Sequence, residues 1–130
     1  MGVCVIDASA MLRLITAQPE AQEIERRVAE CALVLAPALM LTEVANVLWK
    51  LQRAVALPAA ADPQELLRTA TELVDHLEPD RHLQAEALAL AIRLNHPVYD
   101  CLYLALARRE AAQLLSCDQR LLRLAEQVLP

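Results

Sequence analysis

Four acidic residues occupy positions from which a metal-dependent reaction could be organised: Asp7, Glu43, Asp100 and Asp118. Asp7 directly follows Val3–Ile6, an apolar run that is typical of a strand buried on both faces. Asp118 follows a second apolar run at its carboxyl end. Right-handed crossovers place the turns after parallel strands at one edge of a sheet, so we expect these two acids to lie near each other.

Glu43 and Asp100 can reach the same edge of the sheet. Asp100 stands at an expected helix start just after Pro97. Glu43 lies about two turns into a long helical pattern that follows a second strand. Helical side chains point toward the helix N-terminus, so Glu43 can lean back over the carboxyl edge of the sheet.

Four carboxylates gathered in this way would repel one another. Each pair about 5 Å apart costs roughly 1 kcal/mol in water and about 3 kcal/mol at an effective dielectric of about 20. Such a cluster persists mainly around a divalent cation, and oxygen ligands favour Mg²⁺ or Mn²⁺ over Zn²⁺. An ion of this kind can orient a water molecule, lower its pKa and stabilise the charge that develops on a phosphodiester.

A simpler interpretation of the same four acids is also open. Asp7, Asp100 and Asp118 each stand near an expected helix N-terminus, where Asp is favoured as a capping residue. Glu43 can be a solvated residue that pairs with Lys50, seven positions later on the same helix. The spacing alone does not decide between capping and metal binding.

The elements that must position these acids alternate between short strands and helices. Strands are expected at 3–6, 33–35, 77–79 and 113–117, and helices over 8–15, 20–31, 37–55, 64–76, 81–94 and 98–109, with a last helix around 121–125. Asp62 and Asp80 are expected to cap the helices that follow them. This alternation predicts an α/β fold, with a parallel sheet and helices on both faces.

Composition restricts the possible classes of protein. The length of 130 residues suits one domain over residues 1–130, and without a long apolar run or a signal peptide we expect a cytoplasmic protein with no membrane partner. Gly2 is the only glycine, which excludes phosphate-binding and dinucleotide-binding glycine loops. The net charge of −5 argues against binding of nucleic acid through overall charge. The hydrophobic fraction of 57% suggests that a partner or a second copy covers some surface.

The cysteines give no sign of a metal or redox site. The four are Cys4, Cys31, Cys101 and Cys117, which are far apart and form no C-x-x-C pair. We expect them to be reduced, small core residues.

Four blocks of the sequence, at residues 5–10, 37–48, 98–107 and 115–121, resemble the motif blocks of PIN-domain proteins in the same order. The greatest similarity is to the small VapC-type toxins of toxin–antitoxin pairs. This resemblance implies a PIN-like three-layer αβα fold with a short central parallel sheet of four to five strands. It also implies an Mg²⁺- or Mn²⁺-dependent endoribonuclease.

The resemblance assigns roles to individual residues. Asp7, Glu43, Asp100 and Asp118 match the acidic quartet, of which Asp7, Asp100 and Asp118 are expected to hold the metal. Glu43 is expected to bind the metal through water or to accept a proton. Two serines are expected to support the site: Ser9, which can hold Asp7 or a water molecule, and Ser116, where Thr is common in the family. Asn46, one turn beyond Glu43, is a further supporting candidate.

Partners also follow from the resemblance. The substrate would be RNA, and the chain would form a homodimer that a cognate antitoxin protein inhibits. Because such an antitoxin binds its operator DNA, contact of this chain with DNA would be indirect. The alternative is a catalytically inactive PIN-like module for protein interaction. A phosphatase of the haloacid dehalogenase kind does not fit, because Ser9 stands where that class has its second acid.

Several other side chains are assigned smaller roles. Candidates for contacting RNA phosphates are Arg13, Lys50, Arg53, Arg108 and Arg109. His96 is expected to be a turn residue, and Trp49, Tyr99 and Tyr103 are expected in the core or an interface rather than stacked on bases.

Overall fold

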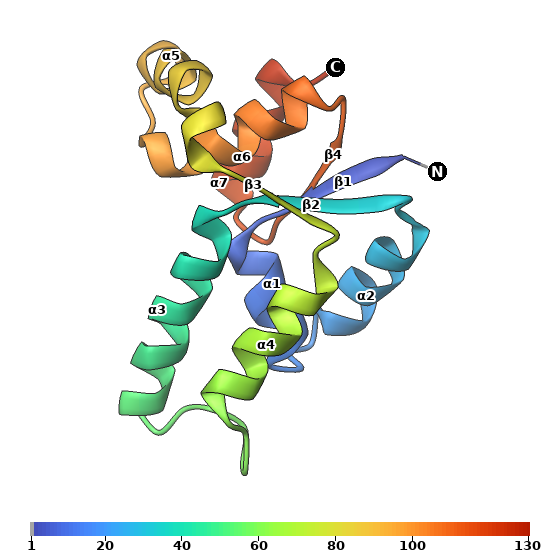
Figure 1. Cartoon of the computed structure of the whole chain (residues 1–130), viewed down its shortest axis with the longest axis vertical. Coiled ribbons are helices and arrows are strands. Elements are labelled where there is room, and N and C mark those ends of the chain that lie inside the picture. Colours follow the sequence, from blue (N-terminus) through green and yellow to red (C-terminus); the bar gives the residue numbers. More distant parts are fainter. Residues whose placement is uncertain (1) are drawn as a thin grey trace.

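The computed structural model describes residues 2–130 and contains three layers, helices–sheet–helices (Figure 1). The sheet consists of β1 (Val3–Ile6), β2 (Leu33–Pro37), β3 (His76–Glu78) and β4 (Gln113–Leu115), in the order β3-β2-β1-β4. All three neighbouring pairs are parallel. The predicted αβα arrangement with a short parallel sheet is confirmed, with four strands.

The helices divide between the two faces of the sheet. One face carries α1 (Ala8–Ile15), α2 (Ala21–Glu30), α3 (Leu39–Arg53) and α4 (Pro63–Leu73). The other carries α5 (Gln84–Leu94), α6 (Val98–Arg109) and α7 (Gln119–Val128), and the short helix η1 (Asp80–His82) leads from β3 into α5. Within residues 2–130, no helix has both the length and the apolar character that a bilayer crossing requires.

The carboxyl ends of the strands meet at one edge of the sheet. Ile6 at the end of β1 pairs with Leu115 at the end of β4, and Pro37 at the end of β2 pairs with Glu78 at the end of β3. Because the strands end together, the residues that follow them converge there, as expected for a parallel sheet. This edge therefore collects side chains from segments far apart in the sequence.

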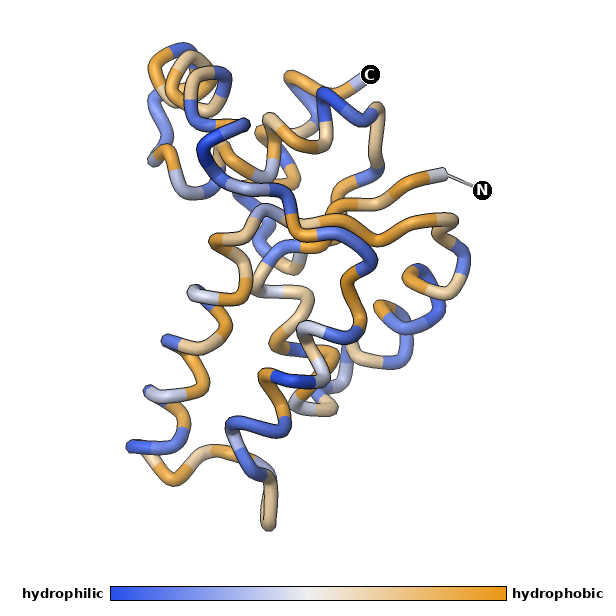
Figure 2. The backbone as a smooth tube through the Cα atoms, viewed as in Figure 1, coloured by the Kyte–Doolittle hydropathy of each residue, from blue (hydrophilic) through white to orange (hydrophobic). Residues whose placement is uncertain are grey.

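The core lies between the sheet and both helical layers. Residues 101–107 of α6 are all buried, and Cys4, Val5 and Ile6 of β1 are completely buried. A helix that is apolar on all sides needs packing on all sides, and α6 has neighbours in β1, β2, α5 and α7. Figure 2 shows hydrophobic residues along the strands and on the helix faces toward them. All four cysteines are free, and Cys4 and Cys101 are buried.

Several element bounds differ by a few residues from the sequence predictions: β2 includes Pro37, α3 begins at Leu39 and β4 ends at Leu115. Two further differences have a clear structural cause. The helix expected over 64–76 ends at Leu73, because Asp75 pairs with β2: its N–H donates to Val34 O at 2.8 Å, and its Oδ2 accepts from Val34 N at 2.7 Å. The prediction that Asp80 caps the following helix is wrong. Its Oδ1 accepts from Leu39 N at 3.1 Å, in the first turn of α3, which has no side-chain cap of its own.

Glu78 anchors the edge strand β3 to its surroundings. Its side chain is buried, and its Oε1 accepts a hydrogen bond from Arg109 Nη1 of α6 at 3.0 Å. His82 Nδ1 lies 2.8 Å from Oε1, and His76 Nε2 lies 2.9 Å from Oε2. The Arg109 hydrogen bond, followed by those of His82 and His76, holds the pKa of Glu78 well below its ordinary value.

Replacing Glu78 by Gln should lower the free energy of unfolding at pH 7 by about 1–3 kcal/mol, because a buried, charge-assisted network is lost. A carboxyl group with a depressed pKa stabilises the fold above its unfolded pKa and loses this effect as the pH falls. The difference between the proteins should therefore narrow below pH 4.5, the ordinary value for Glu. Urea unfolding between pH 7 and pH 3 measures this. Glu72→Gln, at an exposed residue of α4, is the control, and an equal loss in both variants would contradict the anchor role.

Candidate metal and catalytic site

Asp7 is fixed at the end of β1 by three hydrogen bonds to its carboxylate. Ser9 Oγ donates to Oδ1 at 2.7 Å, Ala10 N donates to Oδ1 at 2.9 Å, and Ser116 Oγ donates to Oδ2 at 2.5 Å. The residue is only 4% exposed. Burial raises the pKa of Asp7, these three hydrogen bonds lower it, and the charge of Asp118 raises it. Asp7 is therefore a buried acid whose charge depends on its donors and on its acidic neighbour.

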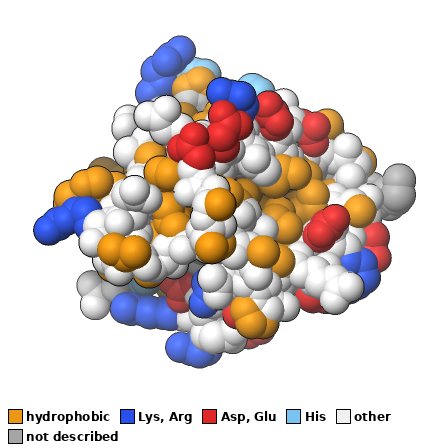
Figure 3. Space-filling model, turned by 90° about the horizontal axis from the view of Figure 1, so that it is seen from below, with side chains coloured by type: hydrophobic (Ala, Val, Ile, Leu, Met, Phe, Trp, Pro, Cys, Tyr) orange, Lys and Arg blue, Asp and Glu red, His pale blue; other side chains and the backbone are white. Residues whose placement is uncertain are grey.

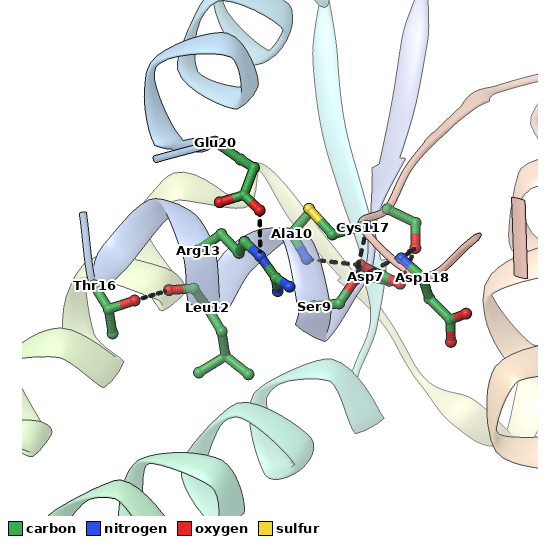
Figure 4. Close-up of polar contacts among 10 residues, drawn as sticks. Asp7, Ser9, Ala10, Leu12, Arg13, Thr16, Glu20, Cys117 and Asp118 are labelled. Carbon is green, nitrogen blue, oxygen red and sulfur yellow. Dashed lines mark hydrogen bonds and ion pairs between the residues drawn. The ribbon is translucent and has the colours of Figure 1, made fainter. Parts of the chain in front are cut away.

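The two serines connect Asp7 to the segment that leads to Asp118. Ser9 Oγ accepts from Cys117 N at 2.9 Å, and Ser116 Oγ accepts from Asp118 N at 3.0 Å. Figure 4 shows Asp7, Ser9, Cys117 and Asp118 gathered where β1 and β4 end, whereas Arg13 of α1 turns toward Glu20 and donates to it. Each serine thus donates to Asp7 and accepts from the backbone after β4, which fixes the two strand ends relative to each other.

Asp118 uses one carboxylate oxygen for capping. It is the N-cap of α7, and its Oδ1 accepts from Arg120 N at 2.9 Å and from Leu121 N at 3.2 Å. Its Oδ2 receives no hydrogen bond from the described residues. Capping is also correct for Asp7, which is the N-cap of α1. Capping and metal binding are thus compatible for these two acids, since capping leaves oxygen lone pairs over.

Asp100 does not cap a helix. The N-cap of α6 is Pro97, and Asp100 Oδ2 instead lies 2.6 Å from His96 Nε2. The His96 Nδ1 atom is buried and has no hydrogen-bond partner among residues 2–130. A proton on Nδ1 would be a buried donor without an acceptor, so Nε2 is the ring nitrogen that donates to Asp100. His96, expected only as a turn residue, holds one oxygen of Asp100 and leaves Oδ1 free of hydrogen bonds from the described part of the chain.

Glu43 is not a solvated residue paired with Lys50. It is half-buried on α3, and its Oε1 accepts from the Tyr103 hydroxyl at 2.5 Å. Burial raises the pKa of Glu43, the Tyr103 hydrogen bond lowers it, and the charges of Asp100, Asp7 and Asp80 raise it. Glu43 therefore lies close enough to Asp100, Asp7 and Asp80 for their charges to act on it at this edge of the sheet.

Asp80 is a further acid near the site, although the sequence predicted for it only the capping of the helix that follows. It comes shortly after β3, just as Asp7 comes after β1, so the same rule of strand ends could have found it. Tyr103 and His96 carried no such signal, because one lies in an apolar helical run and the other beside a proline.

The other candidates lie outside this group. Asn46 is exposed. Arg13, Arg108 and Arg109 form ion pairs with Glu20, Glu86 and Glu78, respectively. Lys50 and Arg53 are exposed on α3 and form no ion pair within the described chain, and the Arg53 guanidinium lies 4.9 Å from the centre of the Trp49 ring.

The donor set at the edge suits a hard divalent cation. No three His, Cys, Asp or Glu side chains among residues 2–130 are already arranged as a formed metal site. However, Glu43 Oε2, Asp100 Oδ1 and Asp118 Oδ2 receive no hydrogen bonds from described residues, and no arginine or lysine of this part of the chain pairs with these acids. Carboxylate oxygens with unrelieved negative charge fit Mg²⁺ or Mn²⁺ rather than Zn²⁺.

Comparisons with known proteins identify the family of the chain. The family model described as PIN domain matches residues 4–127. Ribonuclease VapC3 of Pyrobaculum aerophilum is 31% identical over 119 residues, which cover 90% of each chain.

Solved structures share the fold. The crystal structure of PAE2754 from Pyrobaculum aerophilum has a TM-score of 0.72 and 21% identity, covering 97% of this chain and 81% of that chain. The crystal structure of Mycobacterium tuberculosis VapC20, a toxin that cleaves the sarcin–ricin loop, has a TM-score of 0.69 and 17% identity, covering 92% and 93% of the two chains. The chain therefore belongs to the PIN-domain family and is homologous to the VapC ribonuclease toxins.

Proposed function

We propose that this protein is an endoribonuclease that hydrolyses RNA phosphodiesters with Mg²⁺ or Mn²⁺, and that it is the toxin of a toxin–antitoxin pair. The observation that supports this most is the meeting of acids from separate segments at one sheet edge, where no Arg or Lys of the described residues pairs with them. Homology to Ribonuclease VapC3 supports the choice of RNA hydrolysis.

Each member of the quartet has a proposed role. Asp7, Asp100 and Asp118 would hold the cation, with Ser9 and Ser116 keeping the Asp7 carboxylate in place. When bound, the cation supplies positive charge that stabilises the negative charge developing on the phosphate. Glu43, whose pKa is raised by burial, would accept the proton of the water that attacks phosphorus as the bond to the leaving oxygen breaks.

The surface suits the partners that this function requires. Large apolar side chains are exposed at Trp49 (53%) on α3, at Val55 (91%) just after α3, and at Ile92 (74%) on α5, so apolar area is available there. Figure 3 shows hydrophobic side chains among charged ones on the face seen from below. We propose that a second copy of the chain and a cognate antitoxin cover such area. Contact with operator DNA would be indirect, through the antitoxin, and the site of action would be the cytoplasm.

We propose that two basic side chains contact RNA. Lys50 and Arg53 are the two candidates that form no ion pair within residues 2–130. Both lie on α3, the helix that carries Glu43. Asn46 lies between them and Glu43 on the same helix and is exposed, so we propose it as a polar neighbour of the RNA.

The purified protein without antitoxin should cleave RNA in Mg²⁺ or Mn²⁺ and not in EDTA. Asp7→Asn and Asp100→Asn should lower the rate by more than about 100-fold, because each removes a ligand charge rather than a supporting contact. Gel analysis of a labelled RNA measures this. Asp62→Asn is the matched control: Asp62 Oδ1 caps α4 through Gln64 N at 3.0 Å, and Asn caps as well as Asp. Wild-type rates in Asp7→Asn and Asp100→Asn would contradict the roles given to these acids, whereas no cleavage by the wild type in either metal would favour the inactive interaction module.

Asp100→Asn should also distinguish the effect of charge repulsion on stability from the effect of metal binding, in a measurement that needs no RNA. In EDTA the variant should be as stable as the wild type or more stable, because one charge leaves the cluster. Mg²⁺ at about 100 times its dissociation constant should stabilise the wild type by about 2.7 kcal/mol and the variant by much less. Thermal melts with and without the ion measure both effects. If Mg²⁺ stabilises Asp100→Asn as much as it stabilises Asp62→Asn, Asp100 is not a ligand.

A further inference from the structure

Tyr103 is held rigidly at the point where the two helical layers meet beyond the sheet edge. It lies one turn after Asp100 on α6, is only 1% exposed and stands inside the buried run of residues 101–107. Its hydroxyl reaches Glu43 Oε1 at 2.5 Å, and Glu43 lies on α3, on the opposite face of the sheet (Figure 1). A side chain packed on all sides in this way fixes the position of whatever group it bonds.

The chemistry of this contact suits a metal-binding cluster. Burial, and then the charge of Glu43, raises the pKa of Tyr103 far above its ordinary value, so the phenol stays protonated and donates. Glu43 has the charges of Asp100, Asp7 and Asp80 around it and pairs with no Lys or Arg among residues 2–130. A lysine here would hold Glu43 equally well, but its positive charge would compete with a divalent cation. A phenol holds the carboxylate without adding charge.

The contact also makes the two oxygens of the Glu43 carboxylate inequivalent. Oε1 is taken by Tyr103, whereas Oε2 receives no hydrogen bond from the described residues. The Asp100 carboxylate is similar: its Oδ2 contacts His96 Nε2, and its Oδ1 receives no hydrogen bond from the described residues. Satisfying a buried phenol alone would not require a carboxylate, because a neutral backbone carbonyl is a sufficient acceptor.

We propose that Tyr103 is a positioning residue that holds Glu43 by one oxygen and keeps the other available to the attacking water and, through water, to the cation. This inference rests on the proposed ribonuclease function and adds to it a residue outside the acidic quartet. Tyr103 acts through Glu43 and does not touch the substrate.

The test compares Tyr103→Phe with Tyr99→Phe, which removes the same atom from an exposed tyrosine one turn earlier on α6. For Tyr103→Phe, the kcat of RNA cleavage should fall by about 10- to 100-fold, as is usual for a partner that orients a ligand, while KM for RNA stays unchanged. Calorimetric titration with Mn²⁺ in the absence of RNA should show weaker binding by Tyr103→Phe. Tyr99→Phe should match the wild type in both measurements.

A double-mutant cycle separates positioning from general stability. If Tyr103 acts through Glu43, Tyr103→Phe should cause no further loss of kcat in a Glu43→Gln background. The same loss in both backgrounds, wild-type kcat and Mn²⁺ affinity in Tyr103→Phe, or failure of that variant to fold, would overturn the proposal. If the wild type cleaves no RNA yet Tyr103→Phe weakens Mn²⁺ binding, the ribonuclease function fails and the positioning role stands. If the wild type binds no Mn²⁺, both fail.

Discussion

The convergence of negative charge at the carboxyl edge of the sheet is the constraint on which the rest of this site depends. Parallel strands end together, so Asp7 and Asp118 approach each other, while α3 and α6 bring Glu43 and Asp100 from opposite faces. Burial makes this arrangement more costly, because low polarity strengthens repulsion between carboxylates. The fold tolerates the cost because packing of α6 and the sheet determines where these segments lie.

Side chains other than Lys and Arg hold the acids in place. Ser9 and Ser116 donate to Asp7, Tyr103 donates to Glu43, and His96 contacts Asp100. The hydroxyl groups orient Asp7 and Glu43 without neutralising them, so the cluster keeps its attraction for a divalent cation. Arg109, in contrast, pairs with Glu78 at the end of the edge strand β3, where the ion pair anchors the strand.

The sequence predicted the fold well because strand ends, helix starts and prolines are local signals. Asp7 and Asp118 could be placed by the rule that parallel strands end together, and the motif blocks added Glu43 and Asp100. Tyr103 and Glu43 are separated by 60 positions, so no local pattern reveals their contact. A tyrosine within an apolar helix indicates a core residue, which Tyr103 also is. The end of α4 was misplaced because Asp75 pairs with Val34 of β2, a contact that helical periodicity cannot show.

Anomalous scattering from crystals grown with Mn²⁺ tests the central claim most directly, because it locates the ion without relying on activity. We expect a manganese peak at coordination distance from carboxylate oxygens of Asp7, Asp100 and Asp118, with Glu43 beside it. We also expect Asp100→Asn crystals to lose most of this peak. A peak only elsewhere, such as at Glu78 with His76 and His82, or no peak at Mn²⁺ concentrations that support full RNA cleavage, would contradict the claim.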